Sequence, residues 1–203
     1  MAASSAEEWD TFADTWVATD GLGRALPTVA EAGAPKEDRT VGIFYFLWLD
    51  HRGTQGPFDN SKILAAHPDA LQNPASPPWG PPYASHHWGE SLFGYYLSTD
   101  EAVIRKHAQM LADAGVDVVV FDVTNGFSYR AIYLNLLRIY AEIRAAGGRT
   151  PAIAFLTHSA HGTVVRQLYA DLYSKALYKD LWFLWKGKPL LMADPSGLGD
   201  DIH

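Results

Sequence analysis

The sequence has no cysteine among its 203 residues, which excludes disulfide bonds and thiolate catalysis. It is also poor in positive charge, because 16 lysines and arginines stand against 23 aspartates and glutamates and give a formal net charge of -7. The basic residues are scattered, so the sequence predicts no nucleic-acid partner and no binding to an anionic membrane. A neutral or cationic ligand suits this charge balance better.

Long apolar runs, a secretion signal and phosphate-binding loops are missing as well. No apolar stretch approaches the roughly 20 residues that a membrane helix needs, which predicts a soluble protein. Residues 1–16 lack the basic and apolar regions of a secretory signal, so we expect a cytoplasmic protein, or a periplasmic or secreted one whose signal has been removed. No GxGxxG or GxxxxGK[ST] motif follows a predicted strand, which removes the usual argument for an open nucleotide-binding sheet.

What the sequence contains is a series of strand and helix patterns in a chain of globular composition, 48% hydrophobic and 19% charged. We expect residues 1–40 to form an N-terminal arm with a short helix, and residues 41–203 to form the main domain. Apolar runs predict strands at 41–49, 116–121, 151–157 and 188–193. The first two runs do not alternate with polar residues, which indicates strands buried on both faces of a parallel sheet. Apolar residues at helical spacing predict helices at 100–114, 129–146 and 162–177.

This alternation of strands and helices requires crossover connections and a parallel sheet. An open doubly wound sheet and part of an eight-stranded barrel both satisfy it. We predict an α/β fold of the (β/α)8 TIM-barrel type, with only about four strand–helix units in this chain, because a complete barrel needs about 250 residues. The other half is expected either from a longer chain or from self-association.

Polar residues follow all four predicted strands. Asp50 follows the first strand, Asp122 and Asn125 the second, His158 the third and Asp194 the fourth. Ligands of parallel α/β proteins gather at the carboxyl ends of the strands, so this convergence predicts a binding or catalytic site at that edge of the sheet.

A long connection, residues 50–98, separates the first strand from the first long helix. Only residues 61–66 look helical, and the rest is rich in Pro, Trp, Gly, Tyr and His, including the motif HHWGE at residues 86–90. Connections of this length are usually functional loops or disordered linkers, and disorder fits poorly with so many aromatic residues. The sequence therefore predicts a structured loop that takes part in the site.

Four segments, VGIFYFLW, HHWGE, STDEAVIRKHAQMLADAGVDVVVFDVTNG and WFLWKGKPLLMAD, in this order resemble the barrel glycoside hydrolases related to endo-alpha-mannosidases, the family 99-like group. The resemblance spans residues 41–194. It implies a (β/α)8 barrel that acts on carbohydrate without a redox cofactor. In endo-alpha-mannosidases the acidic catalytic pair lies farther along the barrel, in a region that this chain does not contain, so no catalytic pair is carried over.

The resemblance implies that the candidate residues bind or cleave carbohydrate. Asp122 and Glu90 are the predicted catalytic carboxylates, since glycoside cleavage needs a proton donor and a base or nucleophile. The predicted substrate contacts are His86, His87, Trp88, Asn125, His158, Asp50 and Asp194, with Trp88 stacking on a sugar ring. Two structural alternatives stay open: Asp122 accepts backbone N–H groups of its own turn, and the HHWGE loop is held together by its aromatic residues.

Three functions are therefore considered. The preferred one is hydrolysis of O-glycosidic bonds in an oligosaccharide or glycan substrate, with no metal and no cofactor. The second is a non-catalytic half-barrel that binds carbohydrate or serves in assembly, because fold does not imply function. The third is a metal-dependent hydrolase with His86, Glu90 and His158 as ligands, although the HHxxE spacing is not a recognised helical zinc motif.

Overall fold

The computed structural model describes residues 18–34, 36, 38–49, 56–73, 77–82, 84–196 and 198. Asp50 lies outside these residues. No helix in these ranges is long and apolar enough to cross a lipid bilayer.

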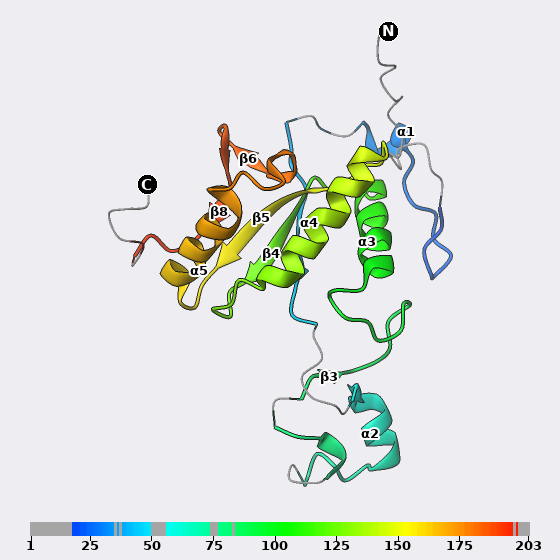
Figure 1. The fold of residues 1–203 in the computed structure, drawn as a ribbon. Helices are drawn as coiled ribbons and strands as arrows, with labels where there is room; N and C mark the ends of the chain where they lie inside the picture. The colour runs from blue at the N-terminus through cyan, green and yellow to red at the C-terminus, as the bar shows by residue number, and fades with distance from the viewer. Residues whose placement is uncertain are drawn as a thin grey trace.

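The elements shown in Figure 1 have these bounds: α1 Val29–Ala32, β1 Gly42–Phe46, β2 Phe58–Asp59, α2 Asn60–Ala66, β3 His86–His87, α3 Glu101–Asp113, β4 Val118–Val123, α4 Arg130–Ala145, β5 Ala152–Thr157, α5 His161–Leu168, β6 Leu184–Trp185, β7 Lys188–Pro189 and β8 Leu191–Met192.

Four strands form a sheet in the order β1-β4-β5-β8, and all three pairings are parallel. Asp122 of β4 is paired with Phe46 of β1 and Leu156 of β5, and Leu156 is paired with Met192 of β8. The predicted parallel α/β sheet is thus confirmed. The described strands form an open sheet and close no barrel among themselves.

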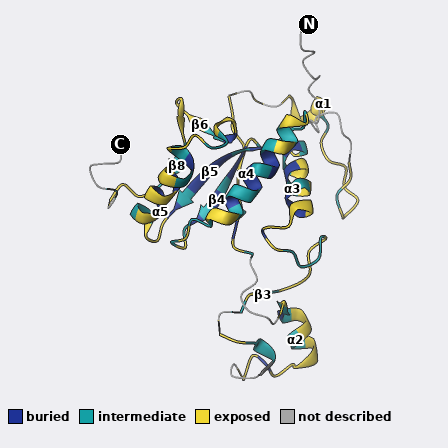
Figure 2. Ribbon diagram, in the orientation of Figure 1, coloured by how far each residue is buried: buried dark blue, intermediate teal, exposed yellow. Residues whose placement is uncertain are grey.

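The three long helices cover one face of this sheet and make the hydrophobic core (Figures 1 and 2). Alternate residues of the central strands point to this face, where the rings of Phe121 and Phe155 meet edge to face at 5.2 Å and Tyr133 of α4 meets Phe155 at 5.4 Å. Asp100 caps α3 at its N-terminus, where its side chain accepts from the amides of Ala102 and Val103. Helices α3 and α4 therefore fall where helical spacing predicts them.

Two segments differ from the sequence expectation. The predicted helix at 162–177 is shorter, because α5 ends at Leu168 and continues as a π-helical turn, Tyr169–Tyr173. The predicted strand at 188–193 is divided between β7, which forms a hairpin with β6, and β8, which pairs with β5. The hairpin turns at Lys186 and Gly187, both with positive φ (51° and 79°), as a two-residue hairpin loop requires.

Strand β1 is not buried on both faces as its sequence predicts. It is an edge strand, and Phe44 and Phe46 are 55% and 50% exposed on the face opposite to the long helices. An unbroken apolar run shows that both faces of a strand are apolar, but it does not show what covers each face. Here no described helix packs on that side of β1.

The described part of residues 56–97 is called here the loop subdomain. Most of it projects away from the sheet (Figure 1), while Phe93 and Tyr96 pack against His107 of α3. Strands β2 and β3 pair in parallel, and α2 packs beside them. Asp59 is only 6% exposed, caps α2 by accepting from the Lys62 amide at 3.1 Å, and also accepts from the Tyr95 hydroxyl. The predicted helix at 61–66 is confirmed as α2, inside a connection that is structured in its described part.

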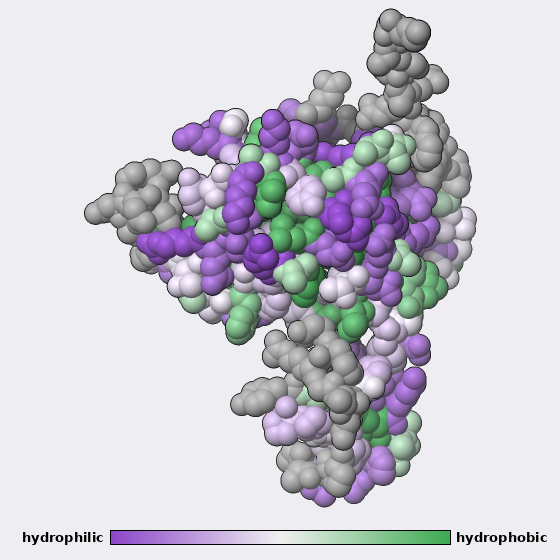
Figure 3. Space-filling model, viewed as in Figure 1, coloured by the Kyte–Doolittle hydropathy of each residue, from purple (hydrophilic) through white to green (hydrophobic). Residues whose placement is uncertain are grey.

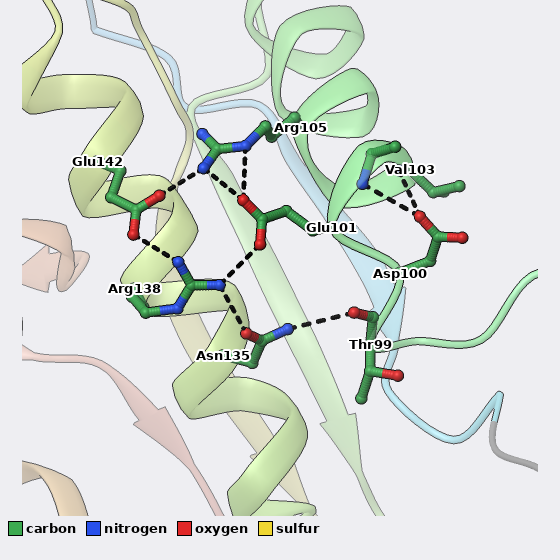
Figure 4. Close-up of polar contacts among 9 residues, drawn as sticks. Thr99, Asp100, Glu101, Val103, Arg105, Asn135, Arg138 and Glu142 are labelled. Atoms are coloured by element: carbon green, nitrogen blue, oxygen red, sulfur yellow. Dashed lines mark hydrogen bonds and ion pairs between the residues drawn. The ribbon is translucent and has the colours of Figure 1, made fainter.

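A ring of four alternating charges joins α3 to α4 (Figure 4). Arg105 donates to Glu101 at 2.7 Å and also to Glu142, while Arg138 donates to Glu101 at 3.0 Å and to Glu142 at 2.5 Å. The two arginines, Arg105 first, hold the pKa values of both glutamates below their usual range. Hydrophilic residues of this kind cover much of the outer helix surface in Figure 3, so this side of the molecule faces solvent.

Candidate functional site

A cavity of about 390 Å³ lies where β4 and β5 end, and we call it the strand-end cavity. The backbone amide of Ser159 donates to the carbonyl of Thr124 at 2.8 Å, which ties together the two loops that border it. Gly126 has a φ of +81°, and a Cβ there would lie 3.4 Å from the Ser159 carbonyl oxygen, so the loops approach closely. The lining residues are Thr124, Asn125, Leu156, Thr157, His158 and Ser159.

The polar lining of the cavity consists of uncharged or weakly basic groups. Asn125 offers an amide, Thr124 and Ser159 offer hydroxyls, and His158 is exposed with its imidazole. The hydroxyl of Thr157 is already used, since it donates to the carbonyl of Met192 at 3.2 Å. This set can exchange hydrogen bonds with a neutral ligand that carries several hydroxyls. Two predicted contact residues, Asn125 and His158, are brought together here.

Asp122 is the penultimate residue of β4, so it lies within the strand and not after it as predicted, and it is half-buried. Its Oδ1 accepts a hydrogen bond from the Thr124 amide at 3.0 Å, so the structural alternative considered for this residue is present. Its Oδ2 accepts no hydrogen bond from the part of the chain that the structure describes. A role of this second oxygen towards a ligand stays a prediction.

Asp194 follows β8, and its Oδ1 accepts from the Ser196 amide at 2.8 Å. Its pKa is lowered, mainly by Ser196 and further by the nearby His161 and His158. The strand order places one strand, β5, between Asp122 and β8, so the backbones of β4 and β8 are about 10 Å apart. The two carboxylates thus lie in or just after the strands on either side of β5, which His158 follows.

The HHWGE residues are held by the loop subdomain. His86 Nδ1 lies 2.8 Å from Asn60 Oδ1, and its ring stacks on Phe58 at 5.6 Å. His87 contacts Tyr95, and Glu90 lies 3.6 Å from the Lys62 amine. None of the four HHWGE candidates is among the lining residues of the strand-end cavity. Their predicted contact with Asp122 and a common ligand is therefore not shown by this arrangement.

Trp88 is the exception to this packing, because its side chain is 70% exposed. An exposed indole is a suitable surface for stacking on a sugar ring. The predicted role of Trp88 in binding stays a prediction.

The three ligands of the metal alternative are not brought together in the structure. His86 and Glu90 belong to the loop subdomain, whereas His158 lines the strand-end cavity. Within the described ranges, no three His, Asp or Glu side chains gather in a way that could hold a metal ion.

Sequence reasoning missed His161, which begins α5 beside the cavity. Its ring contacts the carbonyl oxygens of His158 and Ser196. The sequence offers no signal for it, because both partners are main-chain atoms and one lies 35 residues away.

Comparison with known proteins gives one structural likeness. No protein-family model and no curated protein matches the sequence. A similar solved structure is the family GH99 endo-alpha-mannosidase from Bacteroides thetaiotaomicron in complex with bis-tris propane, at 20% identity and a TM-score of 0.45. The similarity is distant. It covers 78% of this chain and 42% of that chain, so the sequence spans less than half the length of that protein.

Proposed function

We propose that the strand-end cavity binds carbohydrate and that the chain belongs to a glycoside hydrolase-like (β/α)8 barrel acting on the O-glycosidic bonds of an oligosaccharide or glycan. The observation that supports this most is the cavity lining at the carboxyl end of a parallel sheet. It combines an amide, hydroxyls and an imidazole without a charged side chain among the described lining residues. Such a lining suits sugar hydroxyls better than phosphate or carboxylate groups.

In this proposal the chain supplies binding groups and at least one acidic group. Asn125 and His158 bond to sugar hydroxyls, and Asp122 serves as one carboxylate of the acid and base pair. One carboxyl group of such a pair protonates the leaving oxygen, and the other activates water or attacks the sugar carbon. Glu90 acts as the second carboxylate only in an arrangement that brings the loop subdomain against the strand ends, and Trp88 would then stack on the sugar.

A non-catalytic carbohydrate-binding protein is the second candidate. It is favoured by the hydrogen bond from the Thr124 amide to Oδ1 of Asp122, which gives this carboxylate a structural use. Binding without cleavage then requires only the uncharged groups of the lining.

The experiment is calorimetric titration of the 203-residue protein with neutral oligosaccharides, together with release assays on aryl glycosides. Asn125→Ala is expected to abolish sugar binding, whereas the exposed Asn73→Ala in the loop subdomain leaves it unchanged. Asp122→Asn is expected to abolish turnover, and its control Asp113→Asn, at the far end of α3, is not. Binding without turnover in the unmodified protein supports the second candidate, and the absence of binding contradicts both.

A further inference from the structure

Both ring nitrogens of His161 face main-chain carbonyl oxygens. Nδ1 lies 3.0 Å from the carbonyl oxygen of His158, on the loop after β5, and Nε2 contacts that of Ser196, on the segment after β8. A carbonyl oxygen only accepts hydrogen bonds, so each ring nitrogen has to donate. A neutral imidazole has one N–H and an imidazolium has two. The two contacts are therefore satisfied together only when the ring is protonated.

The surroundings favour that protonated form. The hydrogen bonds to Ser196 and then His158 raise the pKa of His161 above its usual value of 6.5, and the carboxylate of Asp194 raises it further, against the effect of burial. Among the residues that the structure describes, the titratable or charged groups near His161 are His158 on the loop after β5, Asp194 on the segment after β8 and, farther along α5, Arg166. Asp194 is the acidic group among them, and its carboxylate favours a proton on His161.

A second cation on α5 holds the same segment. Arg166 donates to the carbonyl oxygen of Leu198 at 2.6 Å and to that of Gly162 at 3.2 Å. The segment after β8 is thus attached to α5 at Ser196 and at Leu198. Arg166 keeps its charge at any pH that the protein meets, whereas His161 loses its second N–H when it is deprotonated. Of these two attachments, the one at Ser196 is the pH-dependent one.

The attached segment carries Asp194. The Ser196 amide donates to Asp194 Oδ1, and the carbonyl of the same Ser196 accepts from His161. Ser196 therefore links the imidazolium to the carboxylate through a single residue. His158 lines the strand-end cavity, and its carbonyl oxygen accepts from the other ring nitrogen of His161. This chain of contacts joins the protonation of His161 to the position of Asp194 beside the cavity.

We propose that His161 is a positioning residue whose imidazolium fixes Ser196, and with it Asp194, against the loop after β5, and that the attachment at Ser196 is lost when the ring loses its proton, while Arg166 still holds Leu198. The attachment itself follows from the contacts of His161. Its effect on a bound ligand rests on the proposed carbohydrate function.

The test uses long-range proton–nitrogen correlation spectra of the 203-residue protein between pH 5 and pH 9.5, which report the protonation of each histidine ring. Amide exchange of Ser196, corrected for its intrinsic pH dependence, is followed in the same samples. We expect His161 to remain doubly protonated above pH 6.5. As it titrates, the protection of the Ser196 amide should fall about tenfold, as expected for one charge-assisted hydrogen bond.

Two variants distinguish the attachment by His161 from a general effect of pH. His161→Gln cannot be a cation, and both of its N–H donors sit on one nitrogen, so it cannot reproduce the contacts that the two ring nitrogens make and should show low Ser196 protection at every pH and no step. His67→Gln, at the exposed end of α2, should keep the step of the unmodified protein. A neutral His161 at pH 6.5, or an unchanged step in His161→Gln, overturns the proposal. Neither measurement involves sugar, so failure of carbohydrate binding contradicts only the proposed function.

Discussion

The backbone amide of Thr124 donates to Oδ1 of Asp122 at 3.0 Å, so the leading acidic candidate also holds the turn that opens the strand-end cavity. This relationship separates two properties of one side chain. The accepted hydrogen bond contributes to stability, whereas the negative charge is what acid and base chemistry requires.

Substitutions at Asp122 should distinguish the two properties. Asp122→Asn keeps an acceptor oxygen for the Thr124 amide and should unfold at nearly the same urea concentration as the unmodified protein. Asp122→Ala removes the acceptor and should lower the free energy of unfolding by about 1 kcal/mol. Urea denaturation measures both. Equal loss in the two variants would show that the charge, not the hydrogen bond, supports the turn.

Tyr140 and Tyr45 should respond in opposite ways to removal of their hydroxyls. The Tyr140 hydroxyl is buried and has no hydrogen-bond partner among the described residues, whereas the Tyr45 hydroxyl lies 3.0 Å from Nδ1 of His107. Tyr140→Phe should leave the free energy of unfolding unchanged or raise it, and Tyr45→Phe should lower it by about 1 kcal/mol. Thermal denaturation measures both. A clear loss in Tyr140→Phe would contradict the unpartnered state of its hydroxyl.

The charge ring between α3 and α4 should make stability depend on salt. Arg138→Gln removes both of its bonds to glutamates and should lower the melting temperature at low ionic strength. The difference from the unmodified protein should shrink in 1 M NaCl, where the screening length falls to about 3 Å. Lys106→Gln, which leaves the ring intact, serves as the control. A difference that is independent of salt would assign the loss to packing.

The loop subdomain should respond to acid through Asp59. The Tyr95 hydroxyl is the main cause that lowers the pKa of Asp59 below 3.8, and Asp59 in turn raises that of Tyr95 to about 12. A lowered pKa in the folded state means that this stabilisation is complete above the unfolded value, about 3.9, and is lost as the pH falls through the folded one.

Carboxyl carbon NMR titration of Asp59 measures this directly. In Tyr95→Phe the titration should move to higher pH, and the stability of the loop subdomain should begin to fall at higher pH as well. Tyr96→Phe, which removes a hydroxyl that makes no bond to Asp59, should leave the titration in place. The same pKa in Tyr95→Phe and in the unmodified protein would rule out the proposed cause.

The parallel sheet could be predicted because strands and helices carry different apolar periods, and those periods are local. The exposure of β1 could not, because the run through Phe44 and Phe46 is apolar whether or not another element covers it. Asn125 and His158 meet at the cavity for a topological reason, since the ends of neighbouring parallel strands share one edge.

The HHWGE loop and His161 show where sequence patterns stop being informative. His86 and Glu90 bond to Asn60 and Lys62, which belong to the same loop subdomain, and a motif alone does not indicate such partners. The ring of His161 contacts main-chain carbonyl oxygens, which every residue has. A histidine whose partners are main-chain carbonyls, one of them 35 residues away, leaves no pattern in the sequence, unlike a helix cap such as Asp100.

The most direct test of the carbohydrate proposal is to map a bound oligosaccharide by amide chemical-shift changes in the 203-residue protein. Neutral oligosaccharides that bind in calorimetry are titrated into labelled protein. The account predicts that the changes gather at residues 124–126 and 157–159 and disappear in Asn125→Ala. Changes confined to the loop subdomain, or no changes at all, would contradict a sugar site at the strand ends.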